Sequence, residues 1–188
     1  MPFVSVTWST LQAPLLEIGG LTANLPRSQS NPKAYLWKAG ASPTLYSWVM
    51  NNHWHTNYRA DQEGETVFCY AIRPHTAYDQ TAAAHFGVES TEPLIAAPAA
   101  GPAPSGPPVE ISPGPIMITS LQPASGGRAL LLRLYNTGET AAQASLKWNA
   151  VTPTEISVSD LAGLPGQRAS GTVELAPYEV RTLRAELK

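Results

Sequence analysis

ALLLRLYNTG, residues 129–138, is the stretch of sequence that decides the fold. Leucine occupies positions 130, 131, 132 and 134, and Arg133 and Tyr135 complete the alternation. Successive side chains of a strand point to opposite faces, so both faces of this segment carry large apolar groups. That pattern predicts a strand covered on both sides, and the Asn-Thr-Gly that follows predicts a turn.

Further alternating segments surround this strand, and turn signals separate them at intervals of about 8–12 residues, which is typical of a β-sandwich. The predicted strands of this half are Ile116–Leu121, Ala129–Tyr135, Ala142–Trp148, Glu155–Ser159, Thr172–Leu175 and Glu179–Leu187. Residues 114–188 are therefore predicted to form a small two-sheet β-sandwich.

A run of proline, alanine and glycine at residues 96–108 separates this half from the rest of the chain. It has no apolar period, and its prolines provide no backbone donors for a sheet. We therefore predict an extended, semi-rigid connector at 96–113 between an N-terminal region, 1–95, and the sandwich, 114–188.

The N-terminal region also reads as short strands separated by loops. Its predicted strands are Phe3–Ser9, Ala34–Lys38, Leu45–Met50 and Thr66–Ile72. Three consecutive alanines favour one short helix over Tyr78–Phe86, with Asp79 or Thr81 near its start. Cys69 lies within an alternating run, which predicts an inert thiol packed in a strand. The chain as a whole is predicted to be all-β.

The composition excludes several classes of function. The chain has 188 residues, a net charge of −2 and 14% charged residues, without the clustered Lys and Arg of nucleic-acid binders. One cysteine rules out an internal disulfide. No signal peptide or membrane span is recognisable, which leaves the compartment open and favours the cytoplasm.

The richest stretch in polar and aromatic groups is YSWVMNNHWHTNY, residues 46–58. Flat rings beside amides are suited to sugars, whose C–H faces stack on rings while their hydroxyls pair with amides. The candidate residues for a carbohydrate or a domain interface are Asn52, His53, Trp54, Asn57 and Tyr58. The alternative is that Trp48 and Trp54 belong to the core and the polar groups bond the backbone.

His53 and His55 lie two residues apart and would share a face of an extended segment, so both imidazoles could reach one zinc ion. Such a site needs a third ligand, for which His75, His85 or Asp61 would have to be brought close by the fold. Separate hydrogen bonds for the two imidazoles explain the pattern more simply, so no metal site is predicted in this chain.

Segments of the chain resemble the C-terminal β region of glycoside hydrolase family 38, the α-mannosidases. These segments, which occur in the order of the family, are APLLEIG at 13–19, NNHWHTNY at 51–58 with FCYAIRPH at 68–75, LRLYN at 132–136 and LAPYEVRTL at 175–183. The resemblance implies the end of a supersandwich-type antiparallel β domain followed by a small C-terminal β-sandwich.

The resemblance also implies that the catalytic domain of the family, with its zinc ligands and aspartate nucleophile, is missing from this chain. Zinc is then expected only in that domain, and no cofactor is expected here. Retaining glycosidases need two carboxyl groups about 5–5.5 Å apart, and no such pair stands out in the sequence. The expected partners are the catalytic domain and mannosides, with no nucleic acid and no membrane.

The expected function is thus a non-catalytic β region that packs on the catalytic domain and helps to shape a carbohydrate cleft. The alternative is a free-standing carbohydrate-binding β module. A fragment also exposes surfaces meant for its neighbours, so self-association is expected as well.

Overall fold

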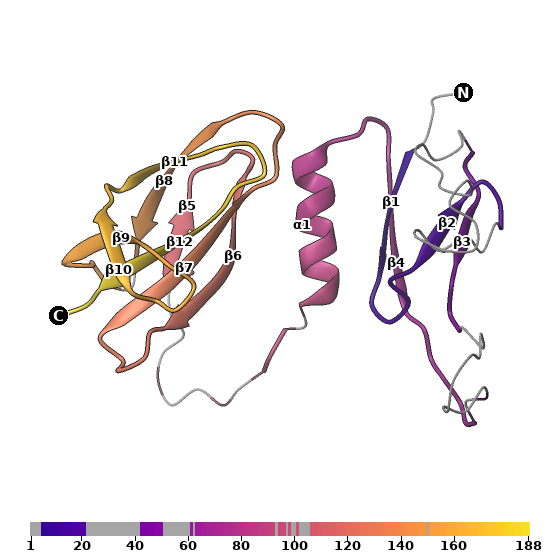
Figure 1. Ribbon diagram of the computed structural model, residues 1–188, viewed down its shortest axis with the longest axis horizontal. Helices are drawn as coiled ribbons and strands as arrows, with labels where there is room; N and C mark the ends of the chain where they lie inside the picture. Colours follow the sequence, from indigo (N-terminus) through magenta and orange to yellow (C-terminus); the bar gives the residue numbers. More distant parts are fainter. Residues whose placement is uncertain are drawn as a thin grey trace, which may run out of the picture. The chain divides into compact units, whose positions relative to one another are not determined.

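The structure is a computed structural model that describes residues 5–21, 42–50, 61, 63–92, 94–96, 98, 101, 106–149 and 151–188 (Figure 1). The chain divides into two compact units. One contains residues 8–73, and the other contains residues 1–7 and 74–188. Within the described residues, no helix is long and apolar enough to span a membrane.

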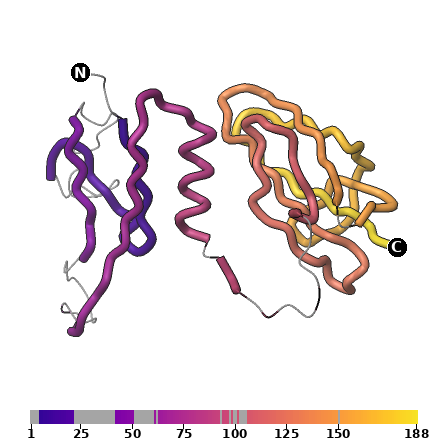
Figure 2. The backbone as a smooth tube through the Cα atoms, turned by 180° about the vertical axis from the view of Figure 1, so that it is seen from behind, coloured from indigo at the N-terminus to yellow at the C-terminus, as the bar shows by residue number. Residues whose placement is uncertain are grey.

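The C-terminal part of the chain forms two antiparallel sheets, whose backbone path can be followed in Figure 2. A five-stranded sheet has the order β10-β9-β12-β7-β6, and a three-stranded sheet has the order β11-β8-β5. The strands are β5 Val109–Ile111, β6 Ile116–Pro123, β7 Ala129–Asn136, β8 Ala142–Trp148, β9 Glu155–Ser159, β10 Pro165–Arg168, β11 Thr172–Leu175 and β12 Val180–Glu186.

One apolar core is built from residues of both sheets. Leu132 and Leu134 of β7 and Leu183 of β12 are fully buried, as is Leu175 of β11. The predicted alternation in β7 is therefore confirmed on the core side. On the other face of β7, the side chains of Leu131, Arg133 and Tyr135 are half-buried. Other parts of the chain therefore cover that face only in part.

The prediction of an all-β fold with a small sandwich is confirmed. β8, β9 and β11 have the bounds expected from the sequence. Two strands of the sandwich, β5 and β10, are not predicted by the sequence pattern. Both are very short, and β10 reads Pro-Gly-Gln-Arg, which has no apolar alternation. β5 lies within the range 96–113 assigned to the connector; the proposed domain boundaries themselves stay a prediction.

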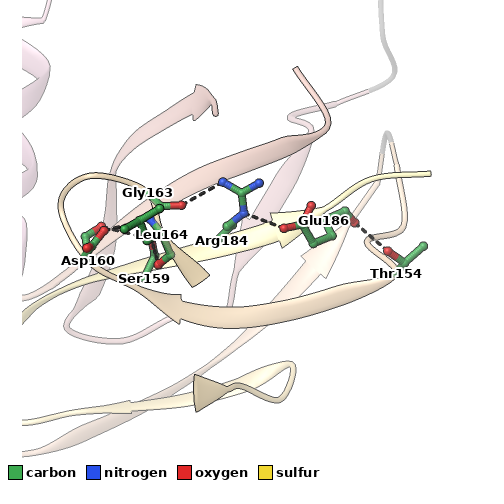
Figure 3. Close-up of polar contacts among 7 residues, drawn as sticks. All are labelled: Thr154, Ser159, Asp160, Gly163, Leu164, Arg184 and Glu186. Carbon is green, nitrogen blue, oxygen red and sulfur yellow. Dashed lines mark hydrogen bonds and ion pairs between the residues drawn. The ribbon is translucent and has the colours of Figure 1, made fainter. Parts of the chain in front are cut away.

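A polar network fixes the turn between β9 and β10 onto the sheet (Figure 3). The Arg184 guanidinium donates to the Gly163 carbonyl at 2.8 Å and to Glu186 at 2.6 Å. Inside the turn, the Leu164 N–H donates to the Asp160 carboxylate at 2.9 Å, and the Ser159 hydroxyl donates to the Leu164 carbonyl at 3.0 Å. The turn thereby sets the position of β10.

Helix α1 spans Gln80–Thr91, which confirms the expected helix but makes it longer at its C-terminal end. Asp79 is its N-cap, and its carboxylate accepts from the Ala82 N–H at 3.0 Å. No residue of α1 is buried. Its first turn contacts the sandwich: Gln80 donates to the Tyr178 hydroxyl at 3.2 Å, and the Thr81 and Thr137 hydroxyls are 3.1 Å apart.

The N-terminal part contains two small sheets. β1 (Ser5–Thr10) pairs with β4 (Tyr70–His75), and β2 (Leu16–Ile18) pairs with β3 (Leu45–Ser47). The predicted strand Leu45–Met50 ends early because β2 offers only three partner residues, Leu16 to Ile18. The predicted strand Ala34–Lys38 lies outside the described residues.

The prediction for residues 66–72 was wrong in its bounds and for Cys69. The strand begins at Tyr70 and runs to His75, so Cys69 lies just before it and its side chain is exposed. Two hydrogen bonds nevertheless fix the backbone of Cys69. The Cys69 N–H donates to the Gln12 side chain at 2.8 Å, and the Cys69 carbonyl accepts from the Leu11 N–H at 3.3 Å.

Candidate functional site

The five candidate residues Asn52, His53, Trp54, Asn57 and Tyr58 lie outside the described residues, as does His55. Their role therefore stays a prediction. The described chain reaches this segment from β3 on one side and resumes at Asp61 on the other. The described side chains around β3 show which functional groups are available in this part of the chain.

Tyr70 connects an aromatic pair with a hydroxyl of β3. Its ring stacks on that of Trp8, with centroids 5.6 Å apart and an angle of 16° between the planes. The Tyr70 hydroxyl lies 2.9 Å from the Ser47 hydroxyl. Tyr70 is 39% exposed, so the group presents both a flat ring and polar atoms to solvent. Sugar recognition uses this combination of groups.

The sequence does not reveal this group, because Trp8 and Tyr70 lie far apart in the chain. Alternation placed each of them in a strand, but it does not show which strands pair. The pairing of β1 with β4 brings the rings together.

Trp48 is half-buried, and its indole N–H donates to the Glu17 carboxylate at 3.3 Å. Its backbone N–H donates to the Leu15 carbonyl at 3.0 Å, next to the β2–β3 ladder. Both contacts hold Trp48 to its own small sheet. This arrangement favours the structural interpretation for Trp48.

His75, one of the residues considered as a third zinc ligand, uses both ring nitrogens in local hydrogen bonds. Nδ1 lies 2.9 Å from the Ala77 carbonyl, which can only accept, so Nδ1 carries the proton. Nε2 lies 3.0 Å from the Thr7 hydroxyl and accepts from it in the neutral ring. Among the described residues, no group of three or more His, Cys, Asp or Glu side chains is arranged to hold a metal ion.

Two carboxylates of the sandwich have perturbed acidity. Hydrogen bonds from Lys147 and Asn149, together with the Lys147 charge, lower the pKa of Glu110. Burial acts to raise the pKa of Glu179, but hydrogen bonds from the Ala176 N–H and from Arg181, with the charge of Arg181, outweigh it and lower that pKa. A glycosidase acid needs the opposite, a raised pKa. These two glutamates are therefore suited to ion pairing.

The segments LRLYN and LAPYEVRTL meet at one corner of the sandwich. Asn136, at the end of β7, is completely buried. Its amide nitrogen lies 2.8 Å from the Thr140 carbonyl, 3.3 Å from that of Leu175 and 2.9 Å from that of Ala176. Its side-chain oxygen accepts from the Gly138 N–H at 2.9 Å. One amide thereby joins the β7–β8 turn to the end of β11.

The other half of the corner is the turn between β11 and β12. Glu179 accepts from the Ala176 N–H at 2.7 Å and pairs with Arg181 at 2.6 Å. Tyr178 has a φ of 57°, which non-glycine residues seldom adopt, and it carries the hydroxyl that α1 contacts. The residues of these two segments thus have structural roles in joining strands.

The sandwich has a counterpart among known families. Residues 115–183 match the family described as "Glycosyl hydrolases family 38 C-terminal beta sandwich domain". None of the curated proteins matches the chain. Among solved structures, the chain is similar to an apo exo-carrageenase GH42 from Bacteroides ovatus at 17% identity and a TM-score of 0.34. That match covers 44% of this chain and 11% of the length of the other.

Proposed function

We propose that this chain, whose residues 115–183 form a C-terminal β-sandwich domain of the glycosyl hydrolase family 38 type, is the non-catalytic C-terminal β region of an α-mannosidase-like enzyme. In this role it packs on a catalytic domain and helps to shape the cleft that receives a mannoside. The observation that carries the proposal is the family match. The corner built by Asn136 and Glu179 supports it, because the side chains of these residues hold the strands of the sandwich together.

The exposed apolar side chains of the N-terminal part support a packing role. Exposed apolar side chains that gather on a surface often mark an interaction site. The exposed residues of β1 to β4 and their flanks are Val6, Leu11, Leu15, Leu16, Ile18, Leu45, Val49, Met50, Val67, Tyr70 and Ile72. Several are more than half exposed, including Val67 at 65% and Ile72 at 62%. We propose that the catalytic domain covers such residues.

The segment that carries Asn52, His53, Trp54, Asn57 and Tyr58 follows β3 in the chain. We assign these residues to the wall of the carbohydrate cleft or to the domain interface. On this proposal zinc belongs to the catalytic domain, and the present chain binds no cofactor.

The packing proposal is tested by expressing this chain and the catalytic domain of the same polypeptide separately and measuring their association by calorimetry. Val67→Glu and Ile72→Glu each place a charge on the proposed contact and are expected to weaken association at least about tenfold. Leu161→Glu is the matched control, since Leu161 is 81% exposed in the β9–β10 turn of the sandwich. Equal affinity for all variants would argue against packing through this face.

The cleft proposal needs a separate measurement, the hydrolysis of an aryl α-mannoside by the reassembled enzyme. Trp54→Ala is expected to raise KM or lower kcat without changing the affinity between the two parts. If the catalytic domain alone is as active as the complex, this chain does not shape the cleft.

The second candidate function is a free-standing carbohydrate-binding module, favoured by the exposed ring and hydroxyls around Tyr70. Titration of the isolated chain with mannose oligosaccharides should then shift its tryptophan fluorescence, and Trp54→Ala should reduce the shift. No change at millimolar sugar would reject this candidate.

The same exposed apolar residues lead us to propose that the isolated chain self-associates. Sedimentation velocity should show larger species whose share rises with concentration, and Ile72→Glu should reduce that share. A single monomeric species at high concentration would contradict the proposal.

A further inference from the structure

A small cleft opens at one edge of the sandwich, where the chain leaves the five-stranded sheet after β10 and enters the three-stranded sheet at β11. Its volume is about 220 Å³. This is below the roughly 300 Å³ at which pockets for drug-sized ligands begin, so the cleft suits a small molecule. Its principal lining residues are Val158, Arg168, Ser170, Val173, Arg181 and Leu183.

Aliphatic side chains line the inner side of the cleft. Leu183 and Val173 belong to the buried core, and Val158 packs against it. Val158 comes from β9 of the five-stranded sheet and Val173 from β11 of the three-stranded sheet, so a ligand body entering here lies against both sheets. The lining residues include no aromatic ring for a sugar to stack on, which favours an aliphatic body.

Arg181 crosses from one sheet to the other at this edge. Its Nη1 donates to the Glu174 carbonyl of β11 at 2.6 Å, while its Nε and Nη2 contact the Glu179 carboxylate. A guanidinium has five N–H donors, so Arg181 has donors left after these contacts.

Arg168 adds a second positive charge to the lining. Its side chain is exposed and has no hydrogen bond or ion pair with any other residue in the described part of the chain. Glu174 lines the same cleft, but it lies on the outer face of β11 beside its strand partner Gln143, which donates to its carboxylate at 3.2 Å. The lining therefore carries two guanidinium groups and one carboxylate, that of Glu174, and within the described residues only Arg181 of the two arginines is paired, with Glu179 beside the cleft.

The backbone at this edge is poorly suited to binding another strand. The Thr172 N–H and carbonyl both bond the Ser170 hydroxyl, and Arg181 occupies the Glu174 carbonyl. Pro165 removes a donor from β10, whose register also shifts between Pro165 and Arg168. Recognition at this edge must then use side chains.

We propose that this cleft binds a small carboxylate with an aliphatic body, the carboxylate pairing with Arg168 and with the free donors of Arg181 while the body lies against Val158 and Val173. Arginine suits this task because its planar fork matches a carboxylate with two parallel hydrogen bonds. The same chemistry is offered by a free aliphatic acid and by the last residue of a polypeptide that ends in Leu or Val. This inference does not depend on the proposed function.

The test uses isovalerate as the probe and amide chemical shifts of the whole chain as the readout. We expect shifts centred on Ala169, Ser170 and Val173, with a Kd on the order of 1–10 mM for so small a ligand. Isovaleramide has the same body without the charge, and acetate has the charge without the body. Both are expected to bind at least about fivefold more weakly.

Arg168→Ala should weaken isovalerate binding at least about tenfold, since a hydrogen bond to a charged group is lost. Arg128→Ala is the matched control, because Arg128 is an exposed arginine in the β6–β7 turn, away from the cleft lining. Equal effects of the two variants, or equal shifts from isovalerate and isovaleramide, would overturn the proposal.

Two further ligands distinguish the sources of the carboxylate. An acetylated dipeptide ending in a free leucine is compared with the same dipeptide as its C-terminal amide. Tighter binding of the free dipeptide than of isovalerate points to a polypeptide terminus, and tighter binding of isovalerate points to a free acid. If neither acid shifts the amides of 169–173, the cleft is not a carboxylate site.

Discussion

The buried amide of Asn136 shows at the residue scale how a sequence element shared with an enzyme family can serve the fold. All of its hydrogen-bonding groups are used inside the corner of the sandwich. A buried polar group that loses its partners costs free energy, and so do the partners left behind. The corner should therefore depend on this one side chain.

Replacing Asn136 with Ala should lower the free energy of unfolding by about 3 kcal/mol, because several buried carbonyl and N–H groups lose their partner together. The measurement is urea denaturation followed by circular dichroism. Asn149→Ala is the control, because that amide bonds the Pro107 carbonyl and Glu110 at the surface, and it should cost less than about 1 kcal/mol. Similar losses for both variants would contradict the role of the corner.

Glu179 should make stability depend on pH. Its pKa is lower in the folded chain than the ordinary value of 4.5, so the stabilisation is complete above that value and is lost as the pH falls through the folded pKa. Glu179→Gln should flatten the decline of unfolding free energy below about pH 4.5.

Glu110 provides a comparison, since the pKa of this exposed carboxylate is also lowered, by Lys147 in the first place. Its contribution should disappear in 0.5 M salt, because ions screen a pair at the surface. An effect of Glu179→Gln that disappears equally in salt would show that Glu179 behaves as a surface charge.

At the scale of single elements, α1 is packed only in part and is supported by its N-terminal cap. None of its residues is buried, and the Asp79 cap satisfies one of its free N–H groups. A helix of twelve residues is marginal without tertiary support.

Asp79→Ala should therefore destabilise α1 locally by about 1 kcal/mol, visible as faster hydrogen exchange of the helix amides with little change in the unfolding of the sandwich. Asp79→Ser should restore most of the protection, because serine is a comparable cap. Unchanged exchange in Asp79→Ala would mean that contacts with the sandwich hold the helix.

The β9–β10 turn depends on Gly163, which has a φ of +83° and lies against Leu131. A Cβ at this position would be 3.1 Å from the Leu131 Cδ1. Gly163→Ala should cost about 1–2 kcal/mol, from backbone strain together with displacement of Leu131. Gly126→Ala has the same kind of φ, +91°, with no atom within 4 Å of the added Cβ, so it measures the strain alone. Equal costs would show that Leu131 moves freely.

At the scale of the whole molecule, the core of the sandwich lies entirely within residues 109–183. A chain of residues 106–188 should accordingly fold by itself and unfold in one cooperative transition in urea. Dispersed amide resonances would confirm this, and a collapsed state without them would mean that the preceding residues are needed.

The sequence predicted this half of the molecule well because its strands are long, alternate clearly and are separated by turn residues. Its resemblance to family 38 is confirmed over residues 115–183. The N-terminal strands were predicted less well, because the length of a partner such as β2 decides where a ladder ends. The stacking of Trp8 on Tyr70 and the cleft beside Arg168 arise from contacts between distant segments, which local patterns do not encode.

The edge formed by β10 and β11 bears on how the sandwich avoids aggregation. Ser170 bonds the Thr172 N–H and carbonyl, Arg181 bonds the Glu174 carbonyl, and Pro165 has no donor, so a strand from another copy finds few partners there. Fibril growth by strand addition is therefore disfavoured at this edge.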